Sequence, residues 1–189
     1  GSYVYTTHNT HWTARSEAPT TGDDRDYIED TKDHGEVWDK ISRSVAKEKG
    51  WRIIKARWID INKGDNDNPL LRSRYVGKEF NTGPMDGLFA ATPPLEALRA
   101  LISEAATVEA EEEEKIIEID DVSRAFFEAP AKRDVCVELP DEALTVEERE
   151  LDLVGHLRMS LYGTRDAANN WQEEIAVVML KNGFIRGKY

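Results

Sequence analysis

The amino-acid sequence predicts an α+β fold in which an antiparallel sheet is covered by packed helices. Residues 51–80 hold two runs rich in β-branched and aromatic side chains on either side of a turn, which is typical of a β-hairpin. Residues 92–105 and 166–182 instead carry apolar side chains at helical spacing. The expected elements do not alternate regularly as strand, helix, strand, so their order favours α+β over a doubly wound sheet.

Composition limits the possible functions. The chain has 189 residues and a formal net charge of −12, which opposes non-specific attraction to a polyanion. A role with nucleic acid therefore requires a local basic patch. Residues 51–80 carry seven basic against four acidic side chains, whereas residues 109–150 carry five against sixteen. The single Cys136 excludes an internal disulfide and indicates a reducing, intracellular compartment. No apolar run approaches the roughly 18 residues of a membrane span, so no membrane partner is expected.

The N-terminal part divides into an arm and a short helix. Residues 1–32 are rich in Thr, Asp, His and Gly without a sustained apolar period, and we expect a flexible polar arm. A helix is expected from Asp33, with Gly50 standing where a C-terminal cap belongs. Its apolar side chains fall on one helical face: Val37, Trp38, Ile41 and Val45.

The hairpin at residues 51–80 is expected to turn at residues 63–69, Lys-Gly-Asp-Asn-Asp-Asn-Pro, a concentrated turn signal. Arg72, Arg74 and Lys78 alternate along its second strand, so the period of two places all three on one face. A guanidinium group can form two parallel hydrogen bonds with the oxygens of a phosphate. This face of the strand is therefore a candidate phosphate clamp. The alternative is an ordinary solvated strand face.

A second helix is expected to begin at Thr92-Pro93-Pro94, an N-cap followed by first-turn prolines. A Glu-rich run at residues 109–114 then predicts a solvated loop. The helix is expected to bury one face: Leu95, Leu98, Leu101, Ile102 and Ala105.

Residues 116–127 form an apolar run that ends in carboxylates and an Ala-Phe-Phe step, which predicts a strand ending at Asp121. A carboxylate in that place can hold Mg²⁺ or Mn²⁺ through hard oxygen ligands. Asp120 points to the opposite face of an extended strand and is the second choice, with a capping or surface role as its alternative. Two more strands are expected at residues 134–139 and 154–161, and the Asp121 strand is expected to pair antiparallel with the second of them.

The last expected helix begins at Asp166 as its cap and ends at Asn182-Gly183. It carries an apolar stripe, Trp171, Ile175, Val178 and Met179.

Taken together, four segments resemble the reverse transcriptase of copia-type retrotransposons in both order and spacing. They are residues 72–80 (RSRYVGKEF), 88–93 (LFAATP), 121–126 (DVSRAF) and 160–167 (SLYGTRDA), followed by Trp171. The resemblance covers residues 51–184. It implies a fingers-and-palm fragment of a Pol polyprotein, with residues 33–108 as the fingers-like part. Residues 109–189 would be a partial palm that ends before the family's second catalytic aspartate motif.

The resemblance also implies roles for single residues. Asp121 would be the catalytic residue and metal ligand, and Arg165 would contact the template backbone. Phe126 would lie under the incoming sugar and favour deoxyribose, although a core role is the alternative for either Phe126 or Phe127. The sequence departs from the family at Asp166, where glutamine is usual and a carboxylate would repel phosphate, and at Ala168, where proline is usual. The implied nucleotide-binding residues are Phe126, Arg72, Arg74, Lys78, Tyr162 and Gly163.

The function implied is RNA-directed DNA polymerase, with an RNA or DNA template-primer, deoxynucleotides and Mg²⁺ or Mn²⁺. Its partners would be the remainder of the Pol polyprotein, namely the rest of the palm, the thumb and RNase H, in a cytoplasmic particle or the nucleus. The chain alone is not expected to polymerise, because two-metal catalysis needs carboxylates from more than one strand. Two alternatives stay open: a non-catalytic nucleic-acid-binding or protein-interaction domain derived from this fold, and an acidic interaction protein.

Overall fold

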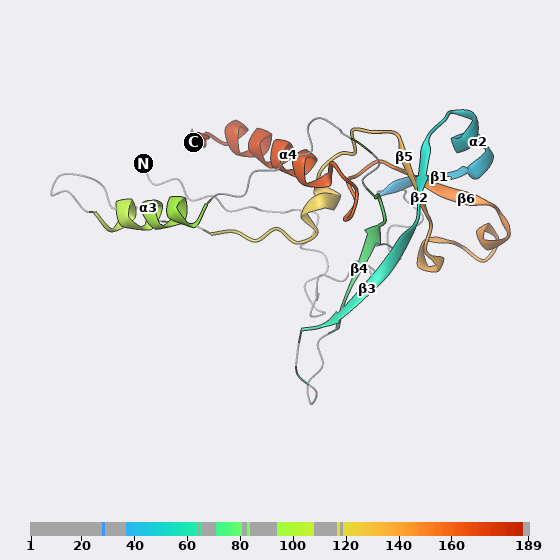
Figure 1. Ribbon diagram of the computed structural model, residues 1–189, viewed down its shortest axis with the longest axis horizontal. Helices are drawn as coiled ribbons and strands as arrows, with labels where there is room; N and C mark the ends of the chain where they lie inside the picture. Colours follow the sequence, from blue (N-terminus) through green and yellow to red (C-terminus); the bar gives the residue numbers. More distant parts are fainter. Residues whose placement is uncertain are drawn as a thin grey trace.

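The structure is a computed structural model (Figure 1). It describes residues 37–63, 65, 71–80, 94–107 and 119–186, together with Ile28, Gly83 and Ile117. This part of the chain is mixed α/β, compatible with the expected α+β class, and contains a four-stranded sheet, a two-stranded hairpin and three α-helices.

The four-stranded sheet is mixed, whereas the sequence predicted an antiparallel one. Its strands are, in spatial order, β1 (Trp38–Ser42), β6 (Leu153–Leu157), β5 (Val135–Glu138) and β2 (Arg52–Ile54). β6 is antiparallel to both of its neighbours, but β2 runs parallel to β5. The long connection from β2 to β5 allows this parallel pairing, which a tight hairpin turn cannot make. Two strands come from residues 33–108 and two from residues 109–189.

The helix expected from Asp33 is correct only in its second half. Residues 38–42 form β1, and α2 spans Arg43–Glu48. Val37 and Ile41 are four residues apart, a spacing that satisfies a helix and also the period of two of a strand. Residues 38–42 pair with β6, and this pairing selects the strand over the helix. Gly50 follows α2 with a φ of 70°, the left-handed conformation expected of a C-terminal glycine.

The predicted hairpin is confirmed. It consists of β3 (Ala56–Asn62) and β4 (Leu71–Gly77), paired antiparallel over seven residues each. In Figure 1 it extends away from the four-stranded sheet. Tyr75 connects the hairpin to the four-stranded sheet, because its buried ring lies 6.0 Å from that of Trp38 in β1. Within the hairpin, the same ring lies 4.9 Å from that of Trp58. The Tyr75 hydroxyl donates to the carbonyl oxygen of Glu138 at 2.6 Å.

The helix expected after Thr92 forms, but its buried face does not. α3 spans Leu95–Ala106 with Pro94 as its N-cap, and none of its side chains is buried. Leu95 is 56% exposed and Leu101 is 62% exposed. The apolar spacing therefore predicted the helix correctly, and was wrong about the packing because no described element covers that face.

α4 spans Ala167–Lys181 and packs against the short 3₁₀ helix η2 (Ala125–Glu128). The buried residues of α4 are Ala167 and Asn170. The predicted stripe is half-buried: Trp171, Ile175, Val178 and Met179. Gly183, at φ 88°, follows the helix as expected.

The strand predicted to end at Asp121 is not present among the described residues. Residues 119–122 have no regular secondary structure, and a turn at residues 123–124 leads into η2. The expected pairing with residues 154–161 is wrong, because β1 and β5 occupy both edges of β6. Ile119 is accordingly 85% exposed.

Some expectations fall on residues outside the described part. They concern residues 1–32 apart from Ile28, the start of the expected helix at 33–36, the turn at 64 and 66–70, the motif at 88–93, the Glu-rich run at 109–114, and residues 116 and 118. Ile28 is buried in the main apolar cluster, so the predicted polar arm contributes at least one side chain to the core.

Candidate nucleic-acid interface

The outer face of the hairpin carries the predicted cations. Ser73, Tyr75 and Gly77 are buried, whereas Arg72 and Arg74, which alternate with them, are only partly buried. The period of two predicted for β4 is therefore confirmed. Lys78 follows the strand and is exposed.

Sequence reasoning missed a further cation on this face. Arg57 of β3 lies directly opposite Val76, and directly paired residues of an antiparallel ladder share a face. Ile59 pairs with Arg74 in the same way. Only the register of the two strands identifies Arg57, and the sequence does not give that register unless the loop between the strands is known.

The base of the hairpin lies against the Tyr162-Gly163 turn. The Gly77 amide donates to the carbonyl oxygen of Tyr162 at 2.7 Å, and the Glu79 amide donates to that of Gly163 at 3.4 Å. Gly163 has a φ of 81°, and a Cβ there would lie 2.1 Å from the Gly77 carbonyl oxygen. A glycine is required at this position, and the close approach that it permits is to β4.

Three of the candidate nucleotide-binding residues meet at Tyr162. The Phe126 ring lies 4.6 Å from the Tyr162 ring, and the Arg74 guanidinium lies 5.3 Å from the same ring, at a distance typical of a cation–π contact. Phe127 is buried, while Phe126 is only partly buried. Phe127 is therefore the core member of this pair.

An open groove of about 480 Å³ lies beside this junction. Two cations, Arg57 and Lys78, contribute to its lining, and so does Phe80, which is 74% exposed. Positive charge with an exposed aromatic ring suits an anionic ligand that has a planar base. The lining residues are Arg57, Val76, Gly77, Lys78, Glu79, Phe80 and Gly163.

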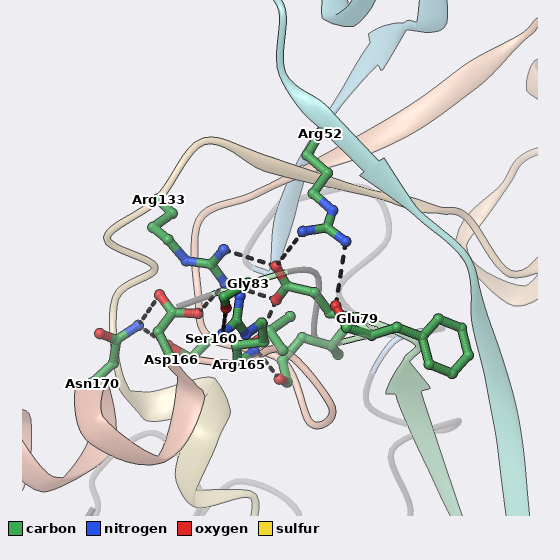
Figure 2. A network of polar contacts seen from close by, with 11 residues as sticks. Arg52, Glu79, Gly83, Arg133, Ser160, Arg165, Asp166 and Asn170 are labelled. Carbon is green, nitrogen blue, oxygen red and sulfur yellow. Dashed lines mark hydrogen bonds and ion pairs between the residues drawn. The ribbon is translucent and has the colours of Figure 1, made fainter. Parts of the chain in front are cut away.

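A buried ionic network underlies the groove (Figure 2). The Glu79 side chain is fully buried, and its carboxylate accepts two hydrogen bonds from Arg133, at 2.9 and 2.8 Å. It also accepts one from the Arg165 amide at 2.8 Å. Arg133 donates to Asp166 at 2.5 Å, and the Asn170 amide donates to the other Asp166 oxygen at 3.1 Å. These contacts join the end of β4, the loop before β5 and the start of α4.

The charges of this network stay ionised because they are paired. Burial raises the pKa of Glu79, but the hydrogen bonds from Arg133 and from the Arg165 amide outweigh burial, and the net pKa is lowered. For Asp166 burial again raises the pKa, and Arg133 and Asn170 lower it to a net decrease. The pKa of Arg133 is raised by its bonds to both carboxylates.

The Asp166 carboxylate thus differs from the sequence-based expectation. It stands at the N-cap of α4 without making a side-chain capping bond, and it pairs with Arg133 instead. A phosphate near the Tyr162-Gly163 turn would therefore not meet a free carboxylate there. The Arg165 guanidinium, expected at the template backbone, donates to the Gly83 carbonyl oxygen at 2.8 Å.

Asp121 and Asp120 are both exposed and precede η2. Within the described ranges, no three His, Cys, Asp or Glu side chains are grouped so that they could hold a metal ion. The described residues therefore do not form a two-metal centre by themselves, and Asp121 stays a predicted ligand.

Comparison with known proteins adds no assignment. No family model, curated protein or solved structure matches the chain. In the part that the structure describes, no helix is both long and apolar enough to cross a membrane.

Proposed function

We propose that the chain is a fingers-and-palm fragment of a copia-type RNA-directed DNA polymerase, and that it binds template-primer at the base of the β3–β4 hairpin. One observation carries the proposal. Three segments of the resemblance, which lie far apart in the sequence, come together at Tyr162: Arg74 from β4, Phe126 from η2 and the Tyr162-Gly163 turn itself. Residues that serve one ligand have to meet in this way.

The charge distribution supports an anionic ligand at this place. The outer face of the hairpin presents Arg57, Arg72 and Arg74, while Asp60 of the same hairpin pairs with Ser73 on the opposite face. The nearest buried carboxylates, Glu79 and Asp166, are both bound by Arg133. A polyanion therefore meets a local positive surface on a chain whose net charge is −12.

We assign nucleic-acid binding, and no catalytic step, to the described surface. Phosphoryl transfer by two metal ions needs a set of carboxylates that holds Mg²⁺ or Mn²⁺. Asp121 would contribute one ligand, and further ligands and the remaining polymerase parts would come from the rest of the Pol polyprotein. The deoxynucleotide would then lie between Asp121, Phe126 and the hairpin.

Binding of a labelled RNA template annealed to a DNA primer, measured over a series of salt concentrations, tests the proposal. Replacing both Arg72 and Arg74 by alanine should lower the slope of log K against log salt by about 1.8, because each lost phosphate contact removes about 0.9. The charge-matched control replaces Arg99 of α3 and Arg149 of η4 (Glu148–Glu150), which are both exposed. Equal slopes for the two double variants would contradict the proposed binding surface.

Primer extension by the longer Pol chain separates the polymerase from its non-catalytic alternative. Asp121→Asn should abolish extension and leave template-primer binding close to that of the wild type. A wild-type Pol chain that binds template-primer without extending the primer would instead support the non-catalytic nucleic-acid-binding domain.

A further inference from the structure

We propose that Glu79 is a positioning residue that holds the Tyr162-Gly163 turn against the end of β4, and so sets the shape of the nucleic-acid-binding groove. This inference rests on the proposed function, because it takes nucleic acid as the ligand of the groove. Glu79 holds the turn at two points. Its amide donates to the Gly163 carbonyl oxygen at 3.4 Å, and its carboxylate accepts from the Arg165 amide at 2.8 Å.

Arg133 makes this connection rigid. Its two terminal nitrogens bind the two oxygens of Glu79, and one of them also binds Asp166 at the far end of the turn. Asn170, one helical turn into α4, donates both to Asp166 and to the Ser160 hydroxyl at 3.0 Å. Figure 2 shows these side chains converging from separate segments. Glu79 and Asp166 therefore hold the two ends of the turn, and Arg133 and Asn170 in turn hold these carboxylates in place.

The groove depends directly on where the turn lies. Gly163 lines the groove together with residues at the base of the hairpin, among them Arg57, Val76 and Lys78. The turn and the hairpin are joined beside the groove, where the Gly77 amide donates to the Tyr162 carbonyl oxygen at 2.7 Å. A shift of the turn would separate Tyr162 from Arg74 and widen the groove, so the bound phosphates would lose contacts that need short distances.

Positioning and simple electrostatics predict opposite results for Glu79. A carboxylate beside an anion-binding groove repels the ligand, so charge alone predicts tighter binding once Glu79 is neutralised. A positioning role predicts weaker binding. Glu79→Gln keeps an oxygen for the Arg165 amide and loses the ion pairs with Arg133 and Arg52, whereas Glu79→Ala loses all three contacts.

The experiment measures the affinity of the folded chain for the labelled RNA–DNA template-primer, with folding checked by circular dichroism. We expect affinity to fall in the order wild type, Glu79→Gln, Glu79→Ala, with a loss of about tenfold in the alanine variant, the size of effect when a buried partner is lost. A folded Glu79→Gln variant that binds as tightly as the wild type, or more tightly, overturns the proposal.

A second variant displaces the turn without changing any charge. Gly163→Ala would put a Cβ against the Gly77 carbonyl oxygen and should weaken binding to a similar degree. Gly183→Ala is the matched control, since Gly183 has a φ of 88° and no atoms within 4 Å of a Cβ built there. If Glu79→Ala does not fold, Glu79→Gln and Gly163→Ala still decide. Unchanged binding in Gly163→Ala counts against the proposal.

Failure of this inference is distinguishable from failure of the proposed function. If the wild-type chain binds template-primer and the Arg72/Arg74 variant shows the lowered salt slope, the outer face of the hairpin is a binding surface whatever Glu79 does. If that variant behaves like its Arg99/Arg149 control, the proposed function itself fails.

Discussion

The four-stranded sheet and the β3–β4 hairpin are built from similar side chains, but they differ in where their charged side chains lie. In β5, Val135, Cys136 and Val137 are all buried, and the Glu138 carboxylate at its end is paired with Arg43. In β4 every second residue is buried, and Arg72, Arg74 and Val76 occupy the positions between. A strand covered on both faces adds stability, whereas a strand covered on one face leaves the other free for a ligand. Substitutions should therefore affect stability in the first sheet and binding in the second.

Truncating a core side chain of the four-stranded sheet should give the largest effect on stability. Leu157 of β6 is 5% exposed and pairs with Trp38. Leu157→Ala should lower the free energy of unfolding by about 3 kcal/mol, because it removes buried methyl groups and leaves a cavity. The matched change in the hairpin, Ile61→Ala at a residue 43% exposed, should cost less than about 1 kcal/mol. Urea denaturation measures both, and equal losses would remove the distinction between the two sheets.

Low pH should weaken the ion pairs of Glu79 and Asp166 with Arg133 and so lower the stability of the chain. The pKa values of Glu79 and Asp166 are lowered in the folded chain, so their contribution to stability is present above their ordinary values of 4.5 and 3.8. That contribution is lost as the pH falls through the lowered values. Thermal unfolding at about pH 6 and about pH 3.5 should show a larger loss in the wild type than in Glu79→Gln, which has no charge to lose there. Identical losses in the two proteins would contradict the importance of this ion pair.

The Tyr75 hydroxyl is a smaller link between the same two parts. It donates from β4 to the Glu138 carbonyl oxygen at the end of β5, at 2.6 Å. Tyr75→Phe keeps the ring contacts with Trp38 and Trp58 and should destabilise the chain by about 1 kcal/mol, the usual net value of such a bond. Unchanged stability in urea denaturation would show that the ring contact with Trp38 holds the hairpin to the sheet without this hydrogen bond.

Local sequence patterns correctly predicted the elements whose structure depends mainly on residues close to them in the sequence. The turn signal at residues 63–69 and the β-branched runs beside it predicted the hairpin, and the alternation of Arg72, Arg74 and Lys78 predicted its outer face. The strand at residues 38–42 was missed because Val37 and Ile41 suit a helix and a strand equally, and only β6 decides. The strand ending at Asp121 was wrong because local composition does not show that β6 already has two neighbours.

The ionic network could not have been predicted from the sequence alone. Glu79 and Arg133 are 54 residues apart, and Arg133 and Asp166 are 33 apart, with no periodicity that relates them. The resemblance drew attention to Asp166 as a departure from the family, but its partner Arg133 lies outside every motif. The Asp166 carboxylate, which was expected to lie near the bound nucleic acid, instead pairs with Arg133 and holds the turn. This pairing depends on tertiary structure.

The smallest effect on stability is expected at Arg57, the cation that the sequence did not single out. Arg57 is exposed and lines the groove, so Arg57→Ala should change the free energy of unfolding by no more than about 0.5 kcal/mol. If it contacts one phosphate, the same change should reduce the salt dependence of template-primer binding by about 0.9. Arg186→Ala, at another exposed arginine, is the control and should leave that slope unchanged. A loss of stability without a change in the salt slope would show that Arg57 has a structural role. The nucleic-acid-binding face of the hairpin would then consist of β4 alone.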